Sequence, residues 1–76
     1  LAPGAIETEL VKKMHTAQTR ISYVSRIPMQ RYGTPEETAS AAVYLCTRDA
    51  GYITGHVLAV DGGFLAAGVV KPLDTD

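Results

Sequence analysis

The stretch Gly51-Tyr52-Ile53-Thr54-Gly55-His56-Val57-Leu58-Ala59-Val60-Asp61-Gly62-Gly63 is an apolar run with turn residues at both ends. No polar residue interrupts 57–60, so the alternation typical of a half-exposed antiparallel strand is missing. The pattern predicts one strand at 56–60, buried on both faces in a parallel sheet. Asp61-Gly62-Gly63 predicts its end, because glycine reaches positive φ freely and aspartate bonds to its own turn. The rest of the sequence shows no second run that could serve as a parallel neighbour.

Residues 1–4 precede the first predicted helix. Pro3 fixes φ and disfavours helix at Ala2, while Gly4 permits a turn. The segment therefore predicts a loop that leaves an earlier strand, and that strand is missing from this sequence. The chain begins with Leu1 rather than Met. We therefore interpret it as a piece of a longer sequence.

The region between this loop and the glycine at position 33 predicts helices. One helix is expected from Thr8, its N-cap, to about Thr19, and a short second helix at 21–27 that ends before Pro28. The first helix rests on apolar residues at helical spacing, which are Leu10, Val11, Met14 and Ala17. Together, residues 8–30 predict an amphipathic helical flap.

The clearest helix start lies at Thr34-Pro35. Thr34 is an N-cap candidate, Pro35 suits the first helical position, and Glu37 completes a capping box. The predicted helix runs over 35–47 and ends before Gly51. Its apolar face would consist of Ala39, Ala42, Val43 and Cys46. The small alanine side chains favour close packing against a sheet or another helix.

Composition limits the possible partners of this chain of 76 residues. It is 46% hydrophobic and 20% charged, which is typical of a globular protein rather than a disordered one. The net charge is -1 without a basic cluster, so neither nucleic acid nor an anionic membrane is predicted as a partner. The apolar stretch at 39–46 is far too short to span a membrane. A soluble protein is expected.

The remaining chemistry-bearing residues predict little. Cys46 is the only cysteine and is expected to be an inert core residue, which fits a reducing compartment, the cytoplasm by default. His15 and His56 have no cysteine or carboxylate at metal-ligand spacing, so no metal site is predicted. We expect His15 to be solvated on its helix, and His56 to be a hydrogen-bonded residue at the entrance to the strand.

The segment 3–8 is more suggestive. A turn followed by a helix N-terminus with a hydroxyl group can hold an oxyanion or an amide of a ligand through backbone N–H groups. Plain capping of the helix explains the same residues equally well. On these residues alone both interpretations stay open.

The order of these signals resembles a known family. Pro3-Gly4-x-Ile6-x-Thr8 is followed by Pro28-Met29-x-Arg31-x-Gly33-x-Pro35-Glu36-Glu37, then by Tyr52-Ile53-Thr54-Gly55 and Val60-Asp61-Gly62-Gly63. Over 2–63 this pattern resembles the C-terminal third of short-chain dehydrogenases/reductases, in particular bacterial 3-oxoacyl-carrier-protein reductases and polyol or sugar dehydrogenases. The resemblance implies an α/β fold, namely the C-terminal piece of a Rossmann-type doubly wound parallel sheet with two or three helices plus the last strand.

The resemblance also implies a function for each segment. The parent would be an oxidoreductase that interconverts an alcohol and a ketone with NAD or NADP. Residues 1–7 would form a nicotinamide-contacting loop, 8–30 a substrate-binding flap, 35–63 the last helix and strand, and 64–76 an apolar tail with a polar end. The cofactor-binding residues would be Pro3, Gly4, Ile6 and Thr8, and the residues facing a small alcohol or carbonyl substrate would be Leu10 and Met14.

Two further expectations complete this interpretation. In the family, the last helix and strand contribute to a homotetramer, which would account for the apolar residues at 64–70. The catalytic serine, the Tyr-x-x-x-Lys pair and the glycine-rich dinucleotide loop lie upstream of the matched segment, and these 76 residues contain none of them. No catalytic residue is therefore predicted here, and hydride transfer is not expected from this segment alone.

A second hypothesis is a truncated, non-catalytic oligomerisation or binding module. The single predicted strand argues against it, because its backbone N–H and C=O groups would lack partners unless a second copy supplied them.

Overall fold

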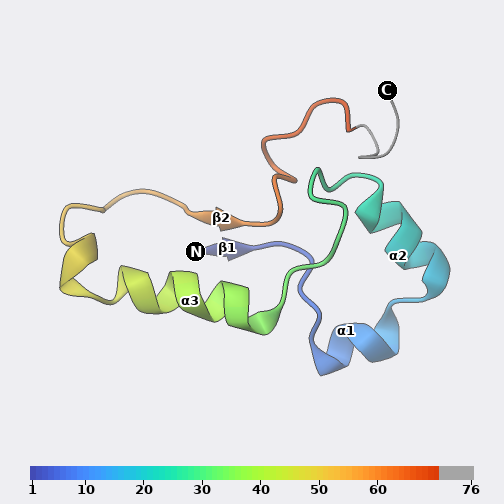
Figure 1. Ribbon diagram of the computed structural model, residues 1–76, viewed down its shortest axis with the longest axis horizontal. Helices are drawn as coiled ribbons and strands as arrows, with labels where there is room; N and C mark the ends of the chain where they lie inside the picture. Colours follow the sequence, from blue (N-terminus) through green and yellow to red (C-terminus); the bar gives the residue numbers. More distant parts are fainter. Residues whose placement is uncertain (71–76) are drawn as a thin grey trace.

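The computed structural model describes residues 1–70, and the polar end predicted at 71–76 lies outside the described residues. The elements in chain order are β1 (Ala2–Pro3), α1 (Glu9–Met14), α2 (Ala17–Val24), α3 (Pro35–Leu45), a 3-10 turn (Arg48–Ala50) and β2 (Ala59–Val60). Figure 1 shows β1 and β2 side by side, with α3 running along them and with α1 and α2 at the other end of the molecule. The molecule measures 41 × 32 × 19 Å. So thin a body encloses little core.

The two strands form a parallel pair. This corrects the prediction that residues 1–4 are a loop whose strand is missing, and also the prediction that no second run serves as a parallel neighbour of the strand at 56–60. Ala2 pairs with Ala59 and Pro3 with Val60. The Ala2 N–H donates to the Leu58 carbonyl over 2.8 Å, and the Gly4 N–H donates to the Val60 carbonyl over 3.0 Å. These donors flank Pro3, so the nitrogen of Pro3, which carries no hydrogen, faces away from β2. Proline is tolerated at such a position because no ladder bond is lost.

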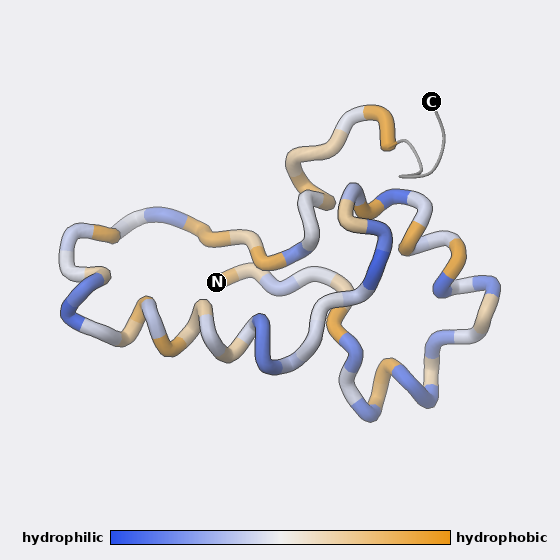
Figure 2. The backbone as a smooth tube through the Cα atoms, in the orientation of Figure 1, coloured by the Kyte–Doolittle hydropathy of each residue, from blue (hydrophilic) through white to orange (hydrophobic). Residues whose placement is uncertain are grey.

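Burial of the predicted strand on both faces is not observed within residues 1–70. Only Ala59–Val60 of the predicted 56–60 is strand, and Val57 is 69% exposed. α3 packs against β2, and Figure 2 shows apolar residues along β2 and in the chain that follows it. One helix cannot cover both faces of a strand. The apolar pattern of this strand therefore indicates that further layers cover it, and residues 1–70 do not supply them.

The predicted helix at 8–19 is divided into α1 and α2. Thr8 caps α1 as expected, since its Oγ1 accepts the Val11 N–H over 3.2 Å. At His15 the backbone is extended, and Thr16 begins a new helix by accepting the Thr19 N–H over 3.2 Å. A second cap, not the apolar spacing, thus decides where α1 ends. The predicted second helix exists, and it starts at Ala17 rather than at 21.

The start of α3 agrees with the sequence. The Thr34 hydroxyl accepts the Glu37 N–H over 3.1 Å, and the Glu37 carboxylate accepts the Thr34 N–H over 2.8 Å. This is the predicted capping box. The prediction of a buried Cys46 is wrong, because Cys46 is the exposed C-cap of α3. The face that carries Val43 and Cys46 has no covering layer in residues 1–70, where Val43 is also exposed.

The turn after β2 is built as predicted, and it contacts the flap. The Asp61 carboxylate accepts the N–H groups of Gly63 and Leu65 over 2.9 and 3.1 Å. Gly62 adopts φ 65°, and a Cβ there would lie 2.8 Å from Ile27, which is 2% exposed. Glycine is required at Gly62 both for its φ and for this close approach. The contact fixes the end of the flap against the end of the sheet.

Candidate functional site

A cleft of about 700 Å³ lies between the first loop, the flap and α3. It is lined by all four residues predicted to bind cofactor, Pro3, Gly4, Ile6 and Thr8. Its size falls in the range of small-molecule sites in proteins. Its other lining residues are Ala5, Val11, His15, Tyr23, Ile27, Pro35, Thr38, Ala39, Ala42 and Phe64.

The first loop is fixed by backbone hydrogen bonds to the segment before α3. The Glu7 N–H donates to the Gly33 carbonyl over 2.8 Å, and the Gly33 N–H donates to the Ala5 carbonyl over 2.9 Å. A Cβ at Gly33 would lie 3.0 Å from Ile6 Cδ1, so a larger residue there would require the end of the Ile6 side chain to shift slightly. Among the bonds of the described residues, the Ile6 N–H has no acceptor. The loop therefore offers a backbone donor on a rigid support.

The cleft also holds polar side-chain groups. The Thr8 hydroxyl accepts the Val11 N–H, so its own proton is still available to a ligand. Thr38 Oγ1 is buried, and within residues 1–70 it has no hydrogen-bond partner. A buried hydroxyl without a partner is unfavourable unless a further group satisfies it.

The residues predicted to face substrate lie elsewhere on the flap. Leu10 and Met14 are 65% and 67% exposed, and the lining of the cleft does not include them. The flap residues that do line it are Val11, His15 and Tyr23.

An ion pair joins the first loop to the flap. Both Nη atoms of Arg20 donate to the Glu7 carboxylate, over 2.7 and 2.6 Å, and the two side chains are about two-thirds buried, with 31% and 32% exposed. This fork geometry is the strongest form of an Arg–carboxylate pair. The hydrogen bond from Arg20 lowers the pKa of Glu7, and the bond to Glu7 raises the pKa of Arg20.

Three aromatic rings form a cluster that contacts Arg20 of this pair through Tyr32. The Tyr32 hydroxyl lies 2.6 Å from His15 Nδ1, and Arg20 Cζ lies 4.9 Å from the centroid of the Tyr32 ring. The His15 ring stacks on Tyr23 with a centroid separation of 5.1 Å. Burial is the main cause of the raised pKa of Tyr32.

This arrangement corrects the prediction for His15. The residue is half-buried and hydrogen-bonded, not solvated on a helix face, because it lies in the extended break between α1 and α2. His56 lies ahead of β2, as expected, but it is exposed, and its side chain makes no hydrogen bond within residues 1–70.

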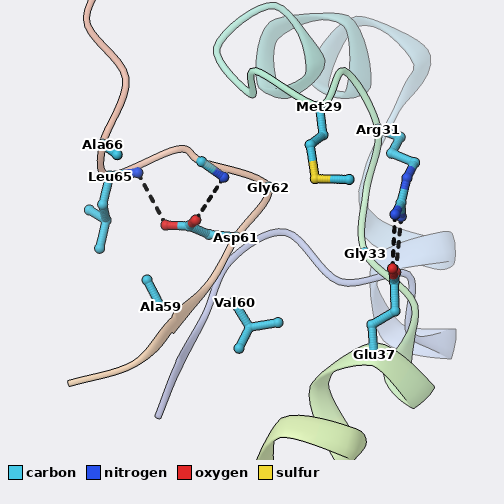
Figure 3. A pocket seen from close by; sticks show the side chains of 11 residues that line it. Met29, Arg31, Gly33, Glu37, Ala59, Val60, Asp61, Gly62, Leu65 and Ala66 are labelled. Atoms are coloured by element: carbon cyan, nitrogen blue, oxygen red, sulfur yellow. Dashed lines mark hydrogen bonds and ion pairs between the residues drawn. The ribbon is translucent and has the colours of Figure 1, made fainter. Parts of the chain in front are cut away.

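A second hollow of about 480 Å³ lies on the β2 side of the segment before α3. Figure 3 shows Arg31 facing Glu37 across a two-fold hydrogen bond, with Asp61 pointing into its own turn. Arg31 and the Thr34 backbone together lower the pKa of Glu37 to about 2. All the carboxylates here are engaged within the chain, so this hollow has the character of a structural joint.

Two negative findings concern residues 1–70 only. They contain no group of three or more His, Cys, Asp or Glu residues placed to hold a metal ion. No helix among them has the length and apolar character needed to cross a membrane.

Comparison with known proteins decides the family. A family model described as enoyl-(acyl carrier protein) reductase matches residues 1–65. The chain belongs to the short-chain dehydrogenase/reductase family. A short-chain dehydrogenase/reductase from Brucella melitensis, described as glucose/ribitol dehydrogenase, is 32% identical and superposes with a TM-score of 0.71 over 82% of this chain and 25% of its own. The predicted α/β class, a piece of a Rossmann-type fold, is thereby confirmed.

Two further short-chain dehydrogenase/reductase relatives extend the comparison. The 3-oxoacyl-(acyl-carrier-protein) reductase of Buchnera aphidicola is 44% identical over 63 residues, which are 83% of this chain and 25% of that protein. A protein of Agrobacterium tumefaciens, provisionally assigned as a 2-deoxy-d-gluconate 3-dehydrogenase and solved with bound NADP, is 42% identical with a TM-score of 0.82, over 87% of this chain and 27% of its own. The chain spans about a quarter of the length of the curated relatives that it matches.

Sequence reasoning missed the cluster of Glu7, His15, Arg20 and Tyr32. In the sequence, Glu7 stands beside Thr8 and Glu9 in what looks like an ordinary acidic start of a helix, and Arg20 is one of several polar residues, so neither stands out. A helix-breaking Thr16 cap was the one available signal that would have moved His15 off a helix face.

Proposed function

We propose that this chain is the C-terminal part of an NAD(P)-dependent oxidoreductase that interconverts an alcohol and a ketone by hydride transfer. The observation that carries the proposal is the convergence of Pro3, Gly4, Ile6 and Thr8 on one cleft. The free N–H of Ile6 supports it, because an amide-bearing ligand needs such a donor. When bound, the nicotinamide supplies or accepts the hydride.

The residues present fit a nicotinamide carboxamide. The Ile6 N–H would donate to the carboxamide oxygen, and the Thr8 hydroxyl would donate its proton to the carboxamide or to the pyrophosphate. Both groups have this capacity left after their bonds within the chain. The support from Gly33 would hold the loop in place without reorganisation when the cofactor binds.

The other segments would have supporting roles. The flap at 8–30 would close over a small alcohol or carbonyl substrate, with Leu10 and Met14 facing it once closed. The apolar residues at 64–70 would form part of a homotetramer interface, which their exposure supports, since Val69 is 99% exposed. A cytoplasmic location is expected from the free Cys46.

The test is a substitution of Thr8 in the complete protein that contains this segment. Thr8→Val should weaken NAD(P)H binding about tenfold through the loss of one ligand hydrogen bond, measured by fluorescence titration. Thr8→Ser should restore it. Thr16→Val is the matched control, because Thr16 caps α2 with the same geometry but does not line the cleft.

If Thr8→Val and Thr16→Val have equal effects, Thr8 is only a helix cap, and its assignment to the cofactor is wrong. If the complete wild-type protein oxidises no reduced nicotinamide cofactor with any ketone of the 3-oxoacyl or sugar class, the proposed activity itself is refuted. Parallel titrations with NADH and NADPH determine which cofactor is used.

A further inference from the structure

Four polar residues from three separate segments meet beside the cleft, and one of them, His15, lines it. Glu7 belongs to the first loop, His15 and Arg20 to the flap, and Tyr32 to the segment before α3. Each of them contacts another of the four directly. An ion pair and a buried tyrosine hydroxyl therefore join the flap to its surroundings. The helices α1 and α2 do not need these contacts for capping, because Thr8 and Thr16 cap them locally.

Glu7 ties this cluster to the cleft. Its side chain is hydrogen-bonded to Arg20. Its backbone N–H donates to the Gly33 carbonyl, and this bond is part of the parallel β-bridge between Ile6 and Gly33. A shift of the Glu7 carboxylate would thus be transmitted to the neighbouring Ile6. The flap and the predicted nicotinamide donor share one mechanical support.

Tyr32 ties the cluster to the flap from the other side. It is among the few buried side chains of the described residues, at 8% exposure, so its position is fixed by packing. From there its hydroxyl bonds to His15 and its ring lies against Arg20. His15 in turn stacks on Tyr23, and both of these rings line the cleft.

We propose that Glu7, Arg20, Tyr32 and His15 form a latch that holds the flap over the nicotinamide-contacting loop, and that Glu7, Arg20 and Tyr32 are positioning residues for the substrate pocket. This inference rests on the proposed function. The latch acts through His15 and Tyr23, the two rings that it orients in the cleft. Misplacement of these two rings weakens substrate binding, which raises KM and leaves kcat nearly unchanged as long as the reacting groups stay in place.

The experiment uses the complete protein with its cofactor and a ketone substrate. At saturating NAD(P)H, Arg20→Met should raise KM for the ketone about tenfold while kcat changes less than about twofold, because it loosens the flap without removing a group that contacts the reacting atoms. Arg20→Lys keeps the charge but loses the fork, so KM should recover only in part.

Coupling within the pair gives a second readout. Glu7→Gln should raise KM similarly, and the double variant should be no worse than Arg20→Met alone, because the two residues act as one unit. If the effects multiply instead, Glu7 and Arg20 act independently and the latch is refuted.

A matched control removes a charge from the flap without contacting the four latch residues. Lys12→Met breaks the exposed ion pair between Lys12 and Glu9 on the flap itself. It should leave KM unchanged. If it raises KM as much as Arg20→Met does, general destabilisation explains the result and the latch is refuted.

Tyr32→Phe provides a variant that is expected to fold normally, so the latch can still be tested if Arg20→Met does not fold. It removes only the hydroxyl bonded to His15 and keeps the packed ring, so a KM rise of about threefold is expected with an unchanged melting temperature. An unchanged KM here and in Arg20→Lys would refute the latch while the oxidoreductase activity stands. A wild-type protein without nicotinamide-dependent activity would refute the proposed function and, with it, the catalytic role of the latch.

Discussion

The two ends of this molecule are stabilised in different ways. At the flap end, side chains from distant parts of the sequence bond to one another, as Glu7 does with Arg20 and His15 with Tyr32. Large apolar residues are exposed at both ends, Leu10 and Met14 at the flap end and Val43 and Val57 at the α3 end. At the α3 end, however, the side-chain bonds are local, so no bonds between distant side chains accompany this exposed apolar surface. Figure 1 shows the flap end around α1 and α2, and the α3 end along β1 and β2.

The difference indicates which end depends on additional structure. The polar side chains at the flap end find their hydrogen-bond partners within the chain. Exposed apolar faces such as those of α3 and β2 are stabilised only when something covers them. The α3 end therefore requires layers beyond residues 1–70, whether from the rest of a Rossmann-type sheet or from a second copy.

The largest effect is expected for residues 1–76 expressed alone. Because the α3 end is uncovered, this polypeptide should self-associate and should lack a sharp cooperative unfolding transition, as measured by size-exclusion chromatography and thermal melting. The double variant Val57→Lys, Val69→Lys should shift the population towards smaller species. A compact monomer with a cooperative transition would contradict the dependence on added layers.

The joint between the two ends should be the next most sensitive site. In the complete protein, Gly62→Ala should reduce the free energy of unfolding by about 2 kcal/mol, since it combines strain at positive φ with a clash on Ile27. Gly55→Ala has the same φ problem with open space around it, and Gly68→Ala has neither problem. The losses, measured by chemical denaturation, should rank Gly62, Gly55, Gly68. Equal losses would show that the contact with Ile27 contributes nothing.

A smaller effect is expected from the capping box of α3. Thr34→Ala removes the acceptor of the Glu37 N–H and should cost about 1 kcal/mol, measured by denaturation of the complete protein. Thr34→Ser retains the acceptor and should cost much less. If the two substitutions are equally destabilising, the hydroxyl bond is not the cause.

The smallest effect is a pH dependence of the same helix start. The pKa of Glu37 falls from its ordinary 4.5 to about 2 in the folded chain, mainly through the hydrogen bond from Arg31. Its contribution is therefore fully present above pH 4.5 and is lost as the pH falls towards 2. Glu37→Gln should flatten the stability profile in this window, whereas Glu36→Gln should not. A profile that is unchanged by Glu37→Gln would contradict this assignment.

The sequence predicted the features that depend on neighbouring residues. The capping box at Thr34 and the turn at Asp61 follow from rules that operate over a few positions, and both are present. The segment 3–8 was also located correctly as a turn leading into a capped helix.

Features that depend on distant residues were missed for a physical reason. Pairing of β1 with β2 and the latch both join residues far apart in sequence, 13 positions for Glu7 and Arg20 and 17 for His15 and Tyr32. Periodicity carries no information about such pairs. Periodicity placed His15 on a helix face because it assumes that the helix at 8–19 is uninterrupted. It placed Cys46 in a core because it assumes that the apolar face of the helix at 35–47 is covered.

The most direct test of the account is to observe the first loop while the cofactor binds. In the isotope-labelled complete protein, titration with NAD(P)H should shift the backbone amide resonances of Ile6 and Thr8, and ADP-ribose, which lacks the nicotinamide, should shift that of Ile6 far less. The Val57 amide, outside the cleft, serves as the reference. Cofactor binding that leaves the Ile6 and Thr8 amides unmoved would contradict the assignment of this loop to the nicotinamide.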